Sequence, residues 1–288
     1  MKHALVALVA ALVAAFAAHA VAAGRAASQR SSKVPQRIVS LSPTATETLF
    51  AIGAGKQVIA VDDQSDYPKN APRTTLSGFT PNVEAIAAYR PDLVVISYSP
   101  NNLAATLRRV GVRVLLQEPA TTLAGAYAQM LQLGRVTGHL AAAKSLVGHM
   151  KARIARLVRS APKEPLTVYD ELTPDYYSAT SASIIGAVLK LFGLRNIADA
   201  AASNGAQAVQ LSAEYIVGSN PDLIILADTR CCGQSVAKVE ERAGWGTITA
   251  VRRGTIAVID DSIASRWGPR LVNFVNAVAS ALRTIAGR

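Results

Sequence analysis

Short apolar runs alternate along the chain with longer segments of helical periodicity. Each run is rich in Val, Ile and Leu, which is typical of a buried strand. The expected strands are 37–41, 58–62, 94–97, 112–116, 166–169, 223–226 and 256–259. Apolar spacing predicts helices between them, at 44–53, 103–110, 184–192 and 269–285. Alternating strands and helices predict parallel sheets in an α/β fold.

One stretch of the chain occurs twice. The stretch that begins at Glu84 contains a short helical segment, a Pro-Asp stop at Pro91 and an apolar strand, and the same plan begins again at Glu214 with Pro221. Each glutamate lies seven residues before its proline, and the copies are 130 residues apart (214 minus 84). The repeat predicts two similar lobes with a ligand between them.

The segment between the two lobes has a purely helical pattern. Residues 122–159 contain no proline and no strand signal, so we expect one long spine helix over 121–162, broken or tightened near Gly134 and Gly138. The predicted fold is therefore α/β, with two Rossmann-like lobes, 37–120 and 163–288, whose parallel sheets are joined by that helix. A stiff spine predicts only limited motion of the lobes.

The first residues of the chain are typical of an export signal. A basic start, an apolar stretch and small residues at candidate cleavage points predict a signal peptide over 1–23 and a linker over 24–36, although an uncleaved membrane anchor is the alternative. We therefore expect a periplasmic or extracytoplasmic protein.

The only two cysteines are adjacent and lie far from the export signal. Because no cysteine near the signal could carry a lipid, we expect that the protein is not a lipoprotein. Cys231 and Cys232 could form a vicinal disulfide in an oxidising compartment or remain two thiols.

Composition and charge narrow the function. The chain has 288 residues, is 50% hydrophobic and has a net charge of +11, which could favour anionic ligands or wall polymers. The arginines are dispersed without a nucleic-acid motif, so we expect no nucleic-acid partner. No nucleophile elbow, paired-histidine motif or phosphate loop is present, so no enzyme is predicted. After the signal only His139 and His149 remain, so we expect no metal site.

Several motifs give the chain a family resemblance. They are Arg37-Ile-Val-Ser-Leu-Ser-Pro43 with Thr46-Glu47, Ser65-Asp66-Tyr67-Pro68, the Glu84 and Glu214 repeats, and Ser265-Arg266-Trp267-Gly268-Pro269-Arg270. With them the chain resembles the substrate-binding proteins of ABC importers for cobalamin, ferric siderophores and haem. The resemblance implies a monomer that carries a small metal chelate to a membrane permease with its ATPase, and no cofactor of its own.

The resemblance also assigns roles to the repeated glutamates. In this family one acidic residue on each lobe docks onto basic residues of the permease, which implies that role for Glu84 and Glu214. Alternatively, each is an exposed first-turn glutamate stabilised by the helix dipole.

Candidate ligand contacts are mainly aromatic, because rings suit a large, rigid, amphipathic ligand. Most follow from the resemblance, and Tyr98 is added because it directly follows a strand. The candidates are Tyr67, Phe79, Tyr98, Tyr176, Tyr177, Arg266 and Trp267. For the last two, the alternative is a capping network in which Trp267 packs the lobe and Asp261 pairs with Arg270.

The resemblance leaves more than one ligand open. A haem carrier would have a tyrosine where this chain has Phe79, and a phenyl ring cannot bind iron. The short loops and aromatic residues favour cobalamin, whereas the basic charge favours an anionic ferric siderophore. A wall-associated binding protein of the same fold is a further alternative.

Overall fold

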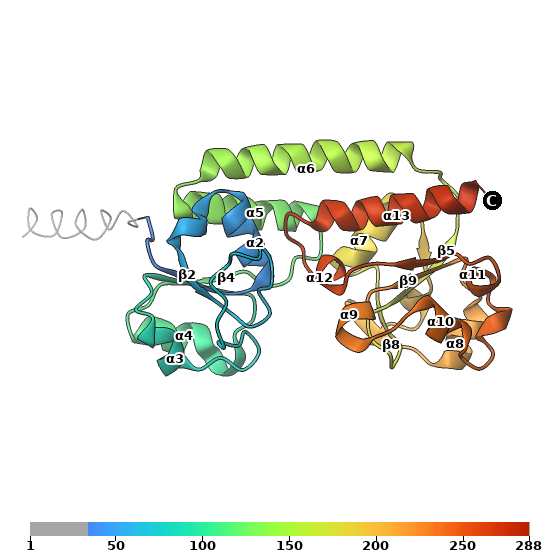
Figure 1. The fold of residues 1–288 in the computed structure, drawn as a ribbon, viewed down its shortest axis with the longest axis horizontal. Helices are drawn as coiled ribbons and strands as arrows, with labels where there is room; N and C mark the ends of the chain where they lie inside the picture. Colours follow the sequence, from blue (N-terminus) through green and yellow to red (C-terminus); the bar gives the residue numbers. More distant parts are fainter. Residues whose placement is uncertain (1–33, 288) are drawn as a thin grey trace, which may run out of the picture. The chain divides into compact units, whose positions relative to one another are not determined.

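The computed structural model describes residues 34–287, and residues 36–288 form one compact unit. The predicted signal peptide, 1–23, and residues 24–33 of the predicted linker lie outside the described residues. Two α/β lobes and a layer of long helices make up this unit (Figure 1).

The first lobe is built on a four-stranded parallel sheet in the order β2-β1-β3-β4. Its strands are β1 (Ile38–Leu41), β2 (Val58–Val61), β3 (Leu93–Ile96) and β4 (Val114–Leu116). Both faces of β1 and β3 are buried, as expected for apolar runs in a parallel sheet. The lobe's helices are α2 (Pro43–Ala51), α3 (Val83–Ala88) and α4 (Leu103–Arg109), with 3₁₀ turns at Ala54–Gln57 and Pro100–Asn102.

The second lobe repeats this plan. Its parallel sheet has the order β10-β9-β5-β7, so in both lobes the first strand lies between the second and the third. The strands are β5 (Thr167–Glu171), β7 (Arg195–Asn196), β9 (Leu223–Leu226) and β10 (Ile256–Val258). An added antiparallel pair, β6 (Tyr177–Ala179) and β8 (Ala208–Gln210), lies in segments where the sequence predicts no strand, because each strand is only three residues long.

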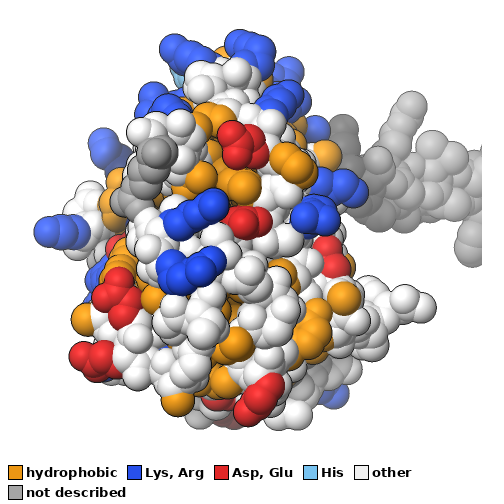
Figure 2. All heavy atoms as spheres, turned by 90° about the vertical axis from the view of Figure 1, so that its right-hand side faces the viewer, with side chains coloured by type: hydrophobic (Ala, Val, Ile, Leu, Met, Phe, Trp, Pro, Cys, Tyr) orange, Lys and Arg blue, Asp and Glu red, His pale blue; other side chains and the backbone are white. Residues whose placement is uncertain are grey.

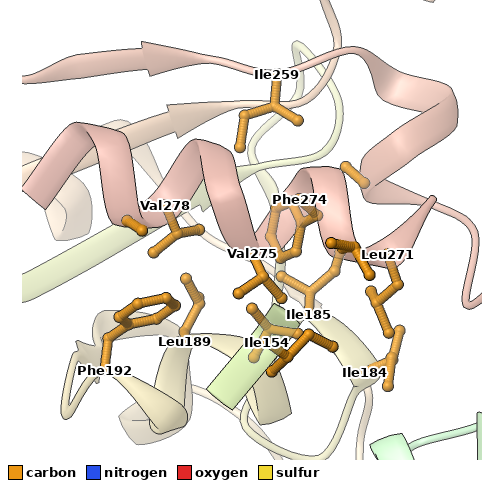
Figure 3. Packing of buried hydrophobic residues seen from close by; sticks show 14 of the residues in the cluster. Ile154, Ile184, Ile185, Leu189, Phe192, Ile259, Leu271, Phe274, Val275 and Val278 are labelled. Atoms are coloured by element: carbon orange, nitrogen blue, oxygen red, sulfur yellow. The ribbon is translucent and has the colours of Figure 1, made fainter. Parts of the chain in front are cut away.

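The helices of the second lobe are mostly short. They are α7 (Ile184–Leu191), α8 (Ala213–Ser219), α9 (Thr229–Cys232), α10 (Val236–Glu240), α11 (Thr249–Arg252), α12 (Asp261–Ala264) and α13 (Leu271–Ala286), with 3₁₀ turns at Ile197–Ala200 and Trp245–Thr247. Figure 3 shows how the long terminal helix is held: Phe274, Val275 and Val278 of α13 pack against Ile185 and Leu189 of α7.

The repeat has a structural cause. The aspartate after each proline accepts backbone N–H groups at the start of the lobe's first strand: Asp92 from Arg37 at 3.0 Å, and Asp222 from Thr167 at 2.9 Å. An equivalent aspartate therefore joins the third strand to the first in each lobe. The predicted equivalence of the two lobes is confirmed.

The segment predicted as one spine helix is two helices, α5 (Leu123–Thr137) and α6 (Leu140–Ser160). Gly138 ends α5 with a positive φ of 79°, and Gly134 has no room for a side chain because its Cβ would lie 2.5 Å from that of Ala143. Only α6 extends along both lobes, with α13 packed on it (Figure 1). The fold class with a long joining helix is thus confirmed. The predicted break near Gly134 and Gly138 is found there, but the segment 121–162 is not one helix, because the two glycines allow the chain to reverse.

A buried carboxylate also joins the lobes. Glu47 on α2 is 2% exposed, and it accepts hydrogen bonds from Arg266 Nη1 at 2.8 Å and Arg270 Nε at 3.0 Å, both in the segment before α13. The alternative pairing of Asp261 with Arg270 does not form, because Asp261 accepts the N–H groups of Arg230 and Cys231 instead.

Two further carboxylates are buried in the second lobe. Asp170 on β5 and Asp228 after β9 are fully buried, and none of their side-chain oxygens has a hydrogen-bond partner of good geometry. Burial raises the pKa of each carboxyl to about 7, and repulsion from neighbouring carboxylates adds to the rise. Their neighbour Glu171 is instead neutralised by Arg242, 2.6 Å away.

These carboxyls make the stability of the fold depend on pH. The folded-state pKa of Asp170 lies above the unfolded value, so the native state holds the proton more tightly and stability falls as pH rises from about 4 to about 7. Asp170→Asn should reduce this fall, leaving the part due to Asp228, and raise the free energy of unfolding at pH 8 by on the order of 2 kcal/mol. Melting curves between pH 4 and pH 8 test this, with exposed Asp175→Asn as control. Parallel pH profiles for parent and variant would contradict it.

Removing Glu47 should be costly. Glu47→Ala leaves two largely buried guanidinium groups without their carboxylate, so we expect the free energy of unfolding to fall by about 3–5 kcal/mol. Denaturant unfolding measures this loss, and exposed Glu240→Ala should stay within about 0.5 kcal/mol of the parent. Equal midpoints for the two variants would show that the contact does not stabilise the fold.

Candidate functional site

A cavity of about 600 Å³ lies where the first lobe meets the segment before α13. Its lining residues are Leu41, Ser42, Pro43, Thr44, Asp62, Gln64, Gly78, Phe79, Ser97, Tyr98, Pro119, Ser265, Arg266 and Trp267. The loops after β1 and β3 both contribute, and these neighbouring strands flank the point where strand order reverses. Open parallel sheets bind ligands in this place.

Hydroxyl groups hold the first-lobe wall of the cavity. Ser42 caps α2 by accepting the N–H of Ala45 at 3.3 Å. Thr46 donates to Ser40 at 2.9 Å from a fully buried position. The loop that follows β1 is therefore fixed by its own side chains.

Three predicted aromatic residues line the cavity. Phe79 is 72% exposed and Tyr98 is 56% exposed, which is unusual for such large rings and leaves apolar surface for a ligand to cover. Trp267 is held by a hydrogen bond from its indole N–H to Gln129 on α5, at 2.7 Å. The first lobe thus contributes two exposed rings to the cavity, and the segment before α13 contributes one ring that a hydrogen bond fixes.

Arg266 also lines the cavity, but its charge is already matched. Its guanidinium donates to Glu47 and to the backbone oxygen of Gln64, each at 2.8 Å, and lies 2.8 Å from a carboxylate oxygen of Asp66. Only 9% of the residue is exposed. Arg266 is therefore poorly placed to act as a free cation for an anionic ligand.

The other predicted tyrosines lie outside the lining of this cavity. Tyr67 is 47% exposed, and the guanidinium of Arg270 lies 4.5 Å from its ring centre. Tyr176 packs on Trp245 within the second lobe, and Tyr177 is partly exposed at the start of β6. Their roles as ligand contacts stay predictions.

The sequence analysis missed two residues of the site. Asp62 follows β2, is 1% exposed and lines the cavity; burial raises the pKa of its carboxyl to about 6, against the opposing effects of Ser65 and Arg266. Gly78 passes so close that a Cβ there would lie 2.9 Å from Asp62 Oδ2. A polar residue directly after a parallel strand was the available signal.

The two repeat glutamates are exposed in the first turns of α3 and α8. Figure 1 shows both helices on the side of their lobes remote from α6. Hydrogen bonds from its own backbone and from Ser212 lower the pKa of the Glu214 carboxyl, so it stays ionised near neutral pH. Their role in docking stays a prediction.

The basic charge gathers on a different surface. The exposed cations of α6 are Lys144, Lys151, Arg153, Arg156 and Arg159, and the helix has no acidic residue. Figure 2, which views the molecule from one end, shows Lys and Arg side chains clustered on its upper part. The cations of α6 therefore lie on the opposite side of the molecule from α3 and α8, which carry the two glutamates (Figure 1).

The remaining expectations concern cysteines, metals and membranes. Cys231 and Cys232 are joined by a disulfide in α9, at an exposed site. Within residues 34–287, no group of three or more His, Cys, Asp or Glu side chains could hold a metal ion. In the same residues, no helix is both long and apolar enough to span a bilayer.

Comparisons with known proteins identify the family. A model of the periplasmic binding proteins matches residues 38–263. The chain is 30% identical over 261 residues to an uncharacterized ABC transporter substrate-binding lipoprotein of Bacillus subtilis, covering 87% of this chain and 81% of that one. It is also 30% identical over 257 residues to a cobalamin-binding protein of Halobacterium salinarum, covering 86% and 69%.

A solved structure of a solute-binding protein has the same fold. A possible iron-binding, periplasmic solute-binding protein of Staphylococcus epidermidis superposes with a TM-score of 0.73 at 27% identity, covering 86% of this chain and 99% of that one.

One expectation needs correction. The Bacillus subtilis relative is named a lipoprotein, which contradicts the expectation that the protein is not a lipoprotein. That expectation depended only on where the cysteines lie in this sequence, and we withdraw it. The chain belongs to the periplasmic binding protein family and is a solute-binding protein of the ABC importer class.

Proposed function

We propose that the protein captures a corrinoid such as cobalamin in the cavity beside Trp267 and delivers it to the permease of an ABC importer. The observation that supports this proposal is that the rings of Phe79 and Tyr98 are exposed to a ligand, whereas the charge of Arg266 is already neutralised by Glu47 and Asp66. A large, flat, largely neutral ligand would cover the rings without needing a free cation.

The relatives' names support this proposal at a coarse level. One relative is named a cobalamin-binding protein, whereas the Staphylococcus epidermidis structure is described as possibly iron-binding. A ferric siderophore is therefore the second candidate, and the net charge of +11 favours it. The separation of charge argues in the other direction, because the cations of α6 lie on a helix that does not line the cavity.

Delivery would use the two repeat glutamates. They occupy equivalent first-turn positions on equivalent helices. A permease with two matching basic sites would therefore bind both glutamates only when the distance between them fits the spacing of its sites. Two lobes held by α6 and by Glu47 would keep that distance nearly fixed. Hydrolysis of ATP would then be the work of the partner.

Ligand titration tests the proposed substrate. Cyanocobalamin should bind with submicromolar affinity and quench the emission of Trp267, because this indole lines the cavity, while buried Trp245 should change little. Ferric siderophores and haem serve as competing ligands, and Trp267→Phe should remove most of the signal. Binding of an iron complex alone would refute the corrinoid assignment.

Charge reversal tests the delivery step. Glu84→Lys with Glu214→Lys should abolish transport in cells while leaving the affinity for ligand unchanged, because neither residue lines the cavity. The matched control is Glu118→Lys with Glu164→Lys, which adds the same charge at exposed positions outside α3 and α8. Normal transport by the first double variant would exclude the docking role, and lost ligand affinity would place the glutamates in the fold or the site instead.

A further inference from the structure

Asp62 is a buried acceptor whose hydrogen bonds are incomplete. The residue is 1% exposed and lines the cavity. Against the effect of burial, hydrogen bonding by Ser65 lowers the pKa of its carboxyl, yet the Oδ1 atom has no hydrogen-bond partner of good geometry. Its backbone is fixed, because its N–H donates to Ser40 O at 3.1 Å and its C=O accepts from Ser65 N at 3.3 Å. A buried acceptor without a partner is costly, so it marks a place where a ligand atom would be stabilised.

The protein blocks the other side of this carboxylate. A Cβ on Gly78 would lie 2.9 Å from Asp62 Oδ2 and 2.9 Å from Leu41 O, so the loop that carries Phe79 approaches the carboxylate closely only because residue 78 is glycine. A donor group of a ligand in the cavity that Asp62 lines would supply the partner that Oδ1 lacks.

The charges around the cavity define which partner fits. Among the described lining residues only Asp62 and Arg266 are charged, and Arg266 is matched by Glu47, Asp66 and the carbonyl of Gln64. A ligand group that donates an N–H or O–H would satisfy Oδ1. A ligand carboxylate placed there would face a like charge, so the same side chain selects for one ligand class and against another.

We propose that Asp62 is a specificity-determining residue that accepts a hydrogen bond from an amide or hydroxyl group at the edge of the ligand. It selects a macrocycle with neutral amide arms over one with carboxylate arms. This inference rests on the proposed corrinoid function and adds the chemical feature by which the corrinoid is chosen.

Two corrins that differ in their arms provide the test. Cyanocobalamin carries amide arms, and dicyanocobyrinic acid carries carboxylates in their place. The parent should prefer the amide corrin. Asp62→Asn should weaken cyanocobalamin binding by about tenfold and reduce the ratio of the two affinities by at least that factor, because the charge is lost and an amide donor is introduced. Asp63→Asn, the exposed neighbour with the same change of charge, should leave the ratio within about twofold.

The outcomes separate this inference from the proposed function. An unchanged ratio in Asp62→Asn, with cyanocobalamin still bound, would overturn the role of Asp62 and leave the corrinoid function standing. If the parent binds neither corrin, both fall together. A melting curve establishes that each variant is folded, and Asp62→Ala, which removes the acceptor without adding a donor, should lose cyanocobalamin affinity in the same way.

Discussion

The structure depends on one buried carboxylate. Glu47 accepts hydrogen bonds from two arginines that lie 219 and 223 residues further along the chain, and it does so almost out of contact with solvent. The contact fixes the segment that brings Trp267 to the first lobe, and it uses the charge of Arg266 that would otherwise face the cavity. The contact of Glu47 with the two arginines therefore fixes the arrangement of the lobes, the position of Trp267 and the charge that faces the cavity.

Much of the fold was predictable because it follows from local patterns. Apolar runs predicted the central strands, of which one in each lobe follows a Pro-Asp pair, and the repeat predicted two similar lobes, which share one strand order in the structure. A break near Gly134 and Gly138 was predicted, but the reversal into two packed antiparallel helices was not, because a helical period looks the same in both cases. The positive φ of Gly138 and the close approach of Gly134 to Ala143 allow the chain to reverse there.

The rings of the candidate site came from the sequence, whereas its charges did not. Phe79, Tyr98 and Trp267 line one cavity, since side chains near the carboxyl ends of parallel strands converge, and their role as ligand contacts stays a prediction. Tyr67 and Tyr176 look the same in sequence, but neither lines the cavity, and their rings contact Arg270 and Trp245 instead. Pairing of Arg266 and burial of Asp62 both depend on residues distant in sequence, which no local pattern can reveal.

The position of these arginines in the chain has a consequence for assembly. The first lobe, with Asp62 and Phe79, is complete in sequence by residue 120, whereas Arg266 and Arg270 lie among the last residues. A chain that passes through a membrane from its amino end would deliver the first lobe long before the groups that neutralise Glu47. The wall that Arg266 and Trp267 contribute closes only when residues 266 and 267 reach Glu47 and the first lobe, so in such a chain the ligand cavity would be completed after the first lobe.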